Sequence, residues 1–394
     1  MGLEIFRSKE GQRERLSVEE VARLFQGLVI PSVTILNEKL EADIEGQTRL
    51  GIETSWMAKA LFYGGTSGMG GNPNFKPDLL RTLVEVGVRV RDKVGRGLET
   101  DDPLLVICGA YGYTAEQAAV LARAGFEAGA NIVVAPPPAF KYNPQRSEIK
   151  LPDDLGEMHK YTFRFYRQLA DLLGPDVPIS AYNIPKPCWR EYCMPPELVM
   201  EILRIPNVIG IKDSSRNGLL TQEYCDVARL VTEAQGRIKR VLSGFFPTLK
   251  GLDKADGGVP IEANLLRLIP LVIWQAAIAK RFEVVEKGQI MAQGFLDEAV
   301  GGLEKKGFPY LAEGPLYYLK LGRLGRGFLL PGQSPVNNPE LQEQIRKVRE
   351  KFVEVPGERQ LLIAAGVPEE FILQAEQIIA KRKDRAAKVG TLAA

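Results

Sequence analysis

The chain of 394 residues contains one histidine, His159, and this scarcity excludes several kinds of catalytic chemistry. A Ser-His-Asp or Cys-His mechanism would depend wholly on that residue, which lies in a charged, helix-like stretch. Metal sites built from several histidines of one chain are excluded as well. We therefore expect the chemistry to run mainly on lysine, tyrosine, carboxylates, hydroxyls and backbone amides.

Cysteine is also sparse, with four residues in the chain: Cys108, Cys188, Cys193 and Cys225. Four cysteines do not form a disulfide framework in a chain of this length. Cys188 and Cys193 have no histidine close to them in the sequence, which argues against a zinc site. We interpret all four as ordinary reduced thiols.

A strong charge of either sign and a long apolar run are both lacking. The formal net charge is +2, which gives no electrostatic reason to expect nucleic acid or an acidic membrane surface as a partner. No segment approaches the roughly eighteen uninterrupted apolar residues typical of a membrane span. Met1 to Leu16 is charged and has no apolar core, so we expect no secretory signal and a cytoplasmic protein.

Short runs rich in β-branched residues alternate with helix-like segments through most of the chain. This alternation is typical of βαβ units and a parallel sheet. The first run is not followed by the G-x-G-x-x-G of a dinucleotide-binding open sheet. We therefore predict a closed (β/α)₈ TIM barrel. Its predicted strands are Gly27–Val33, Ala58–Gly64, Leu104–Ala110, Asn131–Ala135, Val177–Asn183, Asn207–Asp213, Ile238–Gly244 and Gly257–Ile261.

The strand pattern stops near Asn264, and the rest of the chain has a helical pattern. We predict that Leu265–Ala279 is the last helix of the barrel. The predicted domains are a barrel with an N-terminal helix over residues 1–281, and a C-terminal helical region and tail over residues 282–394. The helices expected there are Glu283–Gly301, Gly314–Leu324, Glu340–Val353, Gly357–Ala365 and Pro368–Lys381, with a frayed end over Asp384–Ala394.

Lys212 ends the sixth predicted strand and is the most informative residue of the chain. Burial disfavours an ammonium group and lowers its pKa. A neutral amine at the mouth of a barrel can form a Schiff base with a carbonyl substrate. The alternative is a strand-end lysine that extends to solvent, which is the commoner case for such a residue considered alone.

Other strand ends carry polar groups that would meet Lys212 at one rim, because a TIM barrel gathers its chemistry at the carboxyl ends of its strands. Strand five ends at the phenol of Tyr182, followed by Asn183. Strand two ends in Gly65-Thr66-Ser67-Gly68, whose backbone and hydroxyl groups could hold a carboxylate. Each feature also has a structural interpretation, as an ordinary turn or a packed tyrosine. Their convergence favours the functional one.

These motifs resemble those of the dihydrodipicolinate synthase / N-acetylneuraminate lyase family, in the same order and at similar spacing. The resemblance covers roughly Gly27 to Arg323. The tyrosine and lysine motifs together are specific, whereas the threonine loop alone is a weak signal. The segments that carry it are Gly65-Thr66-Ser67-Gly68, Tyr182-Asn183-Ile184-Pro185, Gly210-Ile211-Lys212-Asp213-Ser214-Ser215, Ser243-Gly244 and Gly257-Gly258-Val259.

The resemblance implies a class I, metal-independent lyase or aldolase without a cofactor, which acts on pyruvate or another 2-oxo acid and an aldehyde. Lys212 would hold the keto carbon as an imine, and Tyr182 would move protons to and from the intermediates. Thr66 and Ser67 would bind the carboxylate, and Ser67 could also relay protons to Tyr182. The loop residue Gly68 and the rim residues Ser243, Gly244, Gly258 and Val259 would line the pocket.

The resemblance also implies a homotetramer or homodimer, and the chain departs from the synthase branch at two places. After Tyr-Asn-x-Pro that branch usually supplies an arginine for the second substrate. Here Lys186, Pro187 and Cys188 stand there, and Arg190 is the nearest arginine.

The second departure concerns a tyrosine pair that the synthase branch carries after strand four, one of which completes a proton relay across the dimer interface. Here the loop from Ala135 to Phe140 has no phenol, and the next tyrosine is Tyr142. Tyr111 and Tyr113, at the end of strand three, are candidates to compensate.

We therefore expect a Schiff-base lyase or aldolase as the leading function. The alternative within the family is a true dihydrodipicolinate synthase, which condenses pyruvate with aspartate semialdehyde in lysine biosynthesis. An alternative of another class is a non-catalytic barrel that binds a small 2-oxo acid. The presence of both Lys212 and Tyr182 argues against this last alternative.

Overall fold

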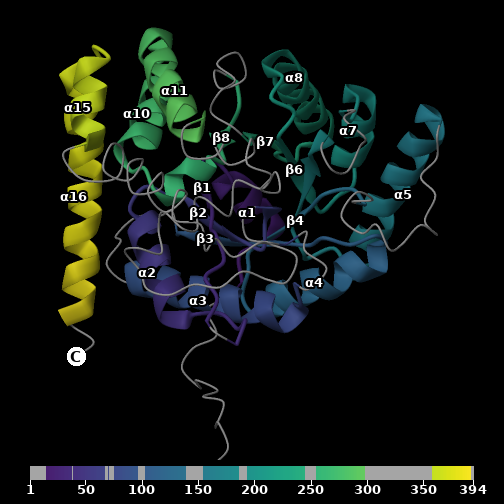
Figure 1. The fold of residues 1–394 in the computed structure, drawn as a ribbon. Coiled ribbons are helices and arrows are strands. Elements are labelled where there is room, and N and C mark those ends of the chain that lie inside the picture. Colours follow the sequence, from purple (N-terminus) through teal and green to yellow (C-terminus); the bar gives the residue numbers. More distant parts are fainter. Residues whose placement is uncertain are drawn as a thin grey trace, which may run out of the picture.

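The computed structural model describes residues 15–37, 39–66, 70, 75–95, 103–138, 154–185, 193–244, 254–297 and 357–391. Eight parallel strands close into a barrel in sequence order, with β8 paired to β1 (Figure 1). This confirms the predicted (β/α)₈ barrel. The strands are β1 Gly27–Pro31, β2 Ala60–Tyr63, β3 Leu105–Gly109, β4 Ile132–Ala135, β5 Ile179–Asn183, β6 Val208–Asp213, β7 Arg240–Ser243 and β8 Gly257–Gly258.

Helices lie between successive strands from β1 to β7 and cover the outside of the barrel (Figure 1). Seven strands are buried throughout and β7 is exposed in part only at its first residue, so the apolar core lies within and around the barrel. The described helices are α1 Val18–Leu24, α2 Ile44–Ser55, α3 Pro77–Gly95, α4 Ala115–Glu127, α5 Leu155–Leu173, α7 Pro196–Leu203, α8 Gly218–Gln235, the 3₁₀ helix η2 Ile261–Asn264, α10 Leu268–Ile278, α11 Phe282–Leu296, α15 Gly357–Ala364 and α16 Glu369–Thr391.

Most of the predicted strands extend one or two residues beyond an end of the observed strand, and two segments of the chain differ more clearly from their predicted extents. The eighth strand was expected to reach Ile261 but ends at Gly258, because Pro260 has no backbone N–H for a strand ladder and caps η2. The end of the chain was expected to fray from Asp384, yet α16 continues to Thr391 through lysine, arginine and alanine, which favour helix. The predicted helices over residues 314–324 and 340–353 lie outside the described residues. The domain boundary after residue 281 stays a prediction.

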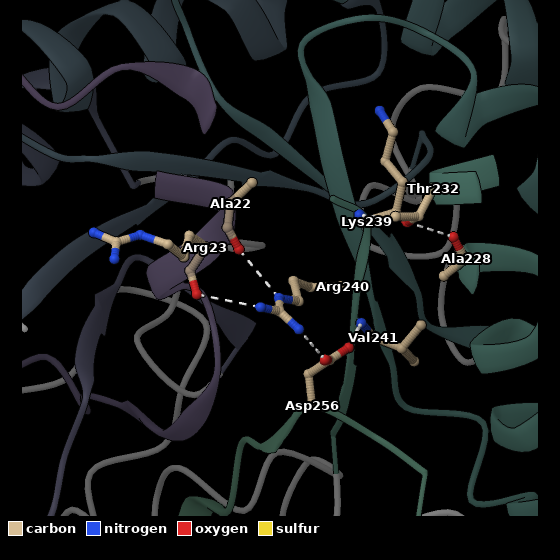
Figure 2. A network of polar contacts seen from close by, with 8 residues as sticks. All are labelled: Ala22, Arg23, Ala228, Thr232, Lys239, Arg240, Val241 and Asp256. Carbon is tan, nitrogen blue, oxygen red and sulfur yellow. Dashed lines mark hydrogen bonds and ion pairs between the residues drawn. The ribbon is translucent and has the colours of Figure 1, made fainter. Parts of the chain in front are cut away.

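At the amino-terminal end of the barrel, Arg240, the first residue of β7, connects α1 to the residue that precedes β8 (Figure 2). Its guanidinium pairs with Asp256 at 2.6 Å and donates to the carbonyls of Ala22 and Arg23 at the end of α1. The second oxygen of Asp256 accepts the Val241 N–H at 2.8 Å. These contacts hold α1 against this end, whereas Lys212 lies near the carboxyl end of β6, at the opposite rim.

The C-terminal helices are tied to the barrel by a carboxylate. α16 packs against α10 and α3, beside the barrel in Figure 1. Glu358 of α15 accepts the backbone N–H groups of Arg267, Leu268 and Ile269 at 2.8–3.0 Å. These groups lie at the start of α10, which has no side-chain cap of its own. A carboxylate there satisfies orphan donors and favours the positive end of the helix dipole.

We predict that Glu358→Ala lowers the free energy of unfolding by about 1–3 kcal/mol, because one buried and two partly buried N–H groups lose their acceptor. Chemical denaturation followed by circular dichroism measures the change. Glu233→Ala serves as the control, since Glu233 pairs with Arg229 on the exposed face of α8. Equal stability losses in the two variants would contradict the capping role.

Candidate active site at the carboxyl end of the barrel

Lys212 and Tyr182 lie side by side at the ends of β6 and β5, where they are register partners. Lys212 is 6% exposed and Tyr182 is 3% exposed. The amine is therefore buried, and the alternative of a lysine that extends to solvent is wrong. The side chains come together because parallel strands deliver their final residues to one rim of the barrel.

The Lys212 amine faces the ring of Tyr182 rather than its hydroxyl. Its nitrogen lies 3.6 Å from the ring centroid. The same nitrogen donates a hydrogen bond of 3.2 Å to Ser214 Oγ, and that hydroxyl donates one of 3.3 Å to Tyr182 OH. Amine, serine and phenol thus form a continuous buried chain.

Burial lowers the pKa of Lys212 to about 7, and the neighbouring Asp213 carboxylate opposes part of this shift. Desolvation penalises the ammonium and leaves the neutral amine unaffected. About half of the lysine is therefore neutral at neutral pH, as a nucleophilic amine requires.

Asp213, the residue that follows Lys212 in β6, is held by a set of hydrogen bonds. It accepts from Asn183 Nδ2 at 2.8 Å, from Thr221 Oγ1 at 2.6 Å and from the N–H and hydroxyl of Ser215. Burial raises its pKa, while these donors act in the opposite direction. The network joins the ends of β5 and β6 to α8, and so fixes the strand ends that carry the lysine and tyrosine.

Thr66, at the end of β2, connects the phenol to a second tyrosine. Its hydroxyl lies 2.7 Å from Tyr111 OH and 3.5 Å from Tyr182 OH. Tyr111 follows β3 and is buried, so one of the two tyrosines considered as substitutes does reach the site. Tyr113 follows it toward α4, where its backbone N–H bonds Gln117 Oε1.

The other predicted rim residues divide into two groups. Ser243 is the register partner of both Asp213 and Gly258, and its carbonyl accepts the Val259 N–H at 2.8 Å. The structure therefore brings this pair of strand ends to the rim of Lys212. The remaining predicted residues lie outside the described residues: Ser67, Gly68, Tyr142, Lys186, Pro187, Cys188 and Arg190.

Gly244 lies against Ser214, and because it has no side chain it leaves the space that the Ser214 hydroxyl occupies. A Cβ added at Gly244 would lie 2.0 Å from Ser214 Oγ. The sequence motifs predict a place in the pocket for Gly244 and no role for Ser214. The signal was present in the motif Lys212-Asp213-Ser214, but which way the serine points depends on this contact between strands.

A second buried lysine, Lys239, has a structural role and provides a comparison for Lys212. Burial lowers its pKa to about 8. It precedes Arg240 at the opposite end of the barrel, and its amine donates to the carbonyl of Val208 at 2.6 Å. Its amine is thus committed to the start of β6, whereas Lys212 bonds a hydroxyl at the end of the same strand.

Over the described ranges, no group of three or more His, Cys, Asp or Glu residues is placed to hold a metal ion. The helices of these ranges also include none long and apolar enough to cross a membrane.

No family model matches the chain. A 4-hydroxy-tetrahydrodipicolinate synthase of Methanoculleus marisnigri is 30% identical over 154 residues, which is 38% of this chain and 44% of that protein. The chain thus matches less than half the length of the curated relatives it resembles.

Two solved structures share the fold of the chain. A catalytic-lysine mutant of the Ruminococcus gnavus sialic acid aldolase has a TM-score of 0.67 at 16% identity, with 89% of this chain and 98% of that one covered. A prophage protein of the dihydrodipicolinic acid synthase family from E. coli K12, in complex with pyruvate, has a TM-score of 0.62 at 19% identity, with 83% and 99% covered. The partial sequence matches and the shared barrel support the predicted resemblance to the dihydrodipicolinate synthase / N-acetylneuraminate lyase family.

Proposed function

We propose that this protein is a Schiff-base-forming lyase or aldolase that makes or breaks a carbon–carbon bond on pyruvate or a related 2-oxo acid. The observation that carries the proposal is the buried Lys212, with its lowered pKa, beside Tyr182 at the barrel rim. Two solved relatives add support, since one is named for its catalytic lysine and the other binds pyruvate.

In this proposal the neutral Lys212 amine attacks the keto carbon to give a carbinolamine, and the keto oxygen then leaves as water. The resulting imine holds the substrate and accepts electrons as the carbon–carbon bond is made or broken. Tyr182 supplies and removes protons at the substrate oxygen. Thr66 and the adjoining Ser67 and Gly68 hold the carboxylate. Tyr111 takes the place of the relay tyrosine expected from a neighbouring subunit, because it contacts Thr66 within the same chain.

The direct test is to incubate the protein with pyruvate and borohydride and to measure the intact mass. We expect a covalent, reduced adduct of one pyruvate per chain. A protein that forms no adduct with any 2-oxo acid would instead be a binding barrel without imine chemistry.

We predict that the rate of imine formation rises with pH between about 6 and 8, with its midpoint near 7. The pKa of Lys212 is lowered to about 7, so its reactive neutral form predominates above that pH and is lost below it. Trapping rates measured across this range give the profile. Asp213→Asn should move the midpoint to lower pH, because the carboxylate that favours the ammonium is gone. A midpoint near 10 would contradict the prediction.

The second candidate function is dihydrodipicolinate synthesis from pyruvate and aspartate semialdehyde, favoured by the names of the two curated relatives. The positions where that branch usually places its arginine hold Lys186, Pro187 and Cys188. We expect weak or no turnover in a coupled assay with aspartate semialdehyde. Robust turnover would establish the synthase activity and overturn our interpretation of the missing arginine.

We further propose a homodimer or homotetramer in the cytoplasm. The assembly follows from the family resemblance, the location is the expectation from the sequence, and sedimentation of the purified protein tests the assembly. The Thr66–Tyr111 contact lies within one chain, so we expect the trapped adduct to form in the separated subunit as well.

A further inference from the structure

The contacts of Lys212 raise the question of how a proton leaves its nitrogen. When a neutral amine attacks a ketone, the nitrogen becomes positive and must lose a proton before the imine can form. The nitrogen lies over the face of the Tyr182 ring and donates its hydrogen bond to Ser214 Oγ. Ser214 in turn donates to the Tyr182 hydroxyl. The serine therefore lies between the group that releases the proton and the acid that the proposed function requires.

Ser214 is held in this position from two sides. Its backbone N–H donates to the carbonyl of Asn183 at 2.8 Å, which fixes it to the strand end that carries Tyr182. Its hydroxyl fills the space that a side chain at Gly244 would occupy. Ser214 is 8% exposed, so bulk water has little access to it.

We propose that the Ser214 hydroxyl relays a proton from the Lys212 nitrogen to the Tyr182 oxygen while the imine forms. This inference rests on the proposed function and deepens it, because it assigns a catalytic residue that contacts the reacting nitrogen. The hydrogen bonds already run in the required direction, from Nζ–H to Oγ and from Oγ–H to the phenol oxygen.

The step balances in atoms and charge. The nitrogen lone pair forms the bond to the keto carbon, and the carbonyl π electrons move to the substrate oxygen. Tyr182 gives its proton to that oxygen, Ser214 gives its proton to Tyr182, and the lysine nitrogen gives one to Ser214. A neutral carbinolamine results, and both hydroxyl residues end as they began.

The test compares Ser214→Ala with wild type by rapid-quench borohydride trapping of labelled pyruvate. We expect the rate of adduct formation to fall about 10–100-fold, which is at or below the lower end of the usual contribution of general acid–base catalysis. The final yield of adduct should be unchanged. Ser214→Thr keeps the hydroxyl and should recover most of the rate. Ser180→Ala is the matched control, because Ser180 is a buried barrel hydroxyl whose hydrogen bond goes to a backbone carbonyl.

The pH profile separates a relay from an indirect effect on the lysine. A relay leaves the midpoint near pH 7 and lowers the rate at every pH. A midpoint displaced toward 10, with the rate recovered at high pH, would mean that Ser214 acts through the pKa of Lys212 and would overturn the relay. An undiminished rate in Ser214→Ala would overturn it too, with the imine function intact. No adduct in wild type would overturn the proposed function itself and the relay with it.

Discussion

Lys212→Ala is expected to abolish the pyruvate adduct and to lower turnover roughly a thousandfold or more, the scale seen when a covalent nucleophile is removed. In the proposed chemistry the imine on Lys212 carries the electrons of the reacting bond, so the reaction is lost with the amine. Intact mass after borohydride treatment measures the adduct, and a discontinuous aldolase assay measures turnover. The variant also removes a buried amine, so it should fold at least as stably as wild type.

Lys239→Met provides the matched control, since it removes the other buried lysine with a lowered pKa. Its amine bonds the Val208 carbonyl at the far end of the same strand, so the adduct should persist at full yield. An adduct that survives Lys212→Ala and disappears in Lys239→Met would move the nucleophile to the opposite end of the barrel.

Tyr182→Phe is expected to slow imine formation by about 10²–10⁴-fold, the usual contribution of a positioned acid or base. The substitution keeps the ring that faces the Lys212 nitrogen and removes only the hydroxyl that bonds Ser214. The pH midpoint should therefore stay near 7 while the maximal rate falls. Rapid-quench trapping over a pH series measures both quantities.

Tyr161→Phe is a suitable comparison for this variant. Tyr161 is a half-buried tyrosine of α5 whose hydroxyl donates to the backbone carbonyl of Tyr113. We expect wild-type trapping rates from it. Equal rates in Tyr182→Phe and wild type would remove the phenol from the mechanism and leave only its ring as a packing surface for the lysine.

The barrel could be predicted because its strands repeat one local pattern, short β-branched runs separated by helical periods. The approach of Lys212 to Tyr182 followed from that topology, since parallel strands end at one rim. The short β8 was not predicted, because Gly257-Gly258 has no side chains to signal its extent and Pro260 ends the ladder. Pro260 is a stop signal for a strand that can be seen in the local sequence.

Ser214 and Tyr111 show where local patterns are insufficient. Tyr111 and Tyr113 stand in nearly the same sequence context, and packing against Thr66 distinguishes them. Ser214 and Ser215 are adjacent hydroxyls, but one bonds the lysine amine and the other bonds Asp213. The bonding partner of each serine depends on strand ends that are distant in the sequence, such as Gly244. No periodicity of the chain encodes that partner.

The Glu358 cap links the last steps of folding to the end of the chain. α10 receives its N-terminal acceptor from a residue that follows Arg267 by 91 positions. During synthesis, a ribosome that has just completed α10 has not yet made the carboxylate that satisfies its first N–H groups. We therefore expect this helix to stay frayed on the nascent chain and to become protected from hydrogen exchange only after α15 has been released.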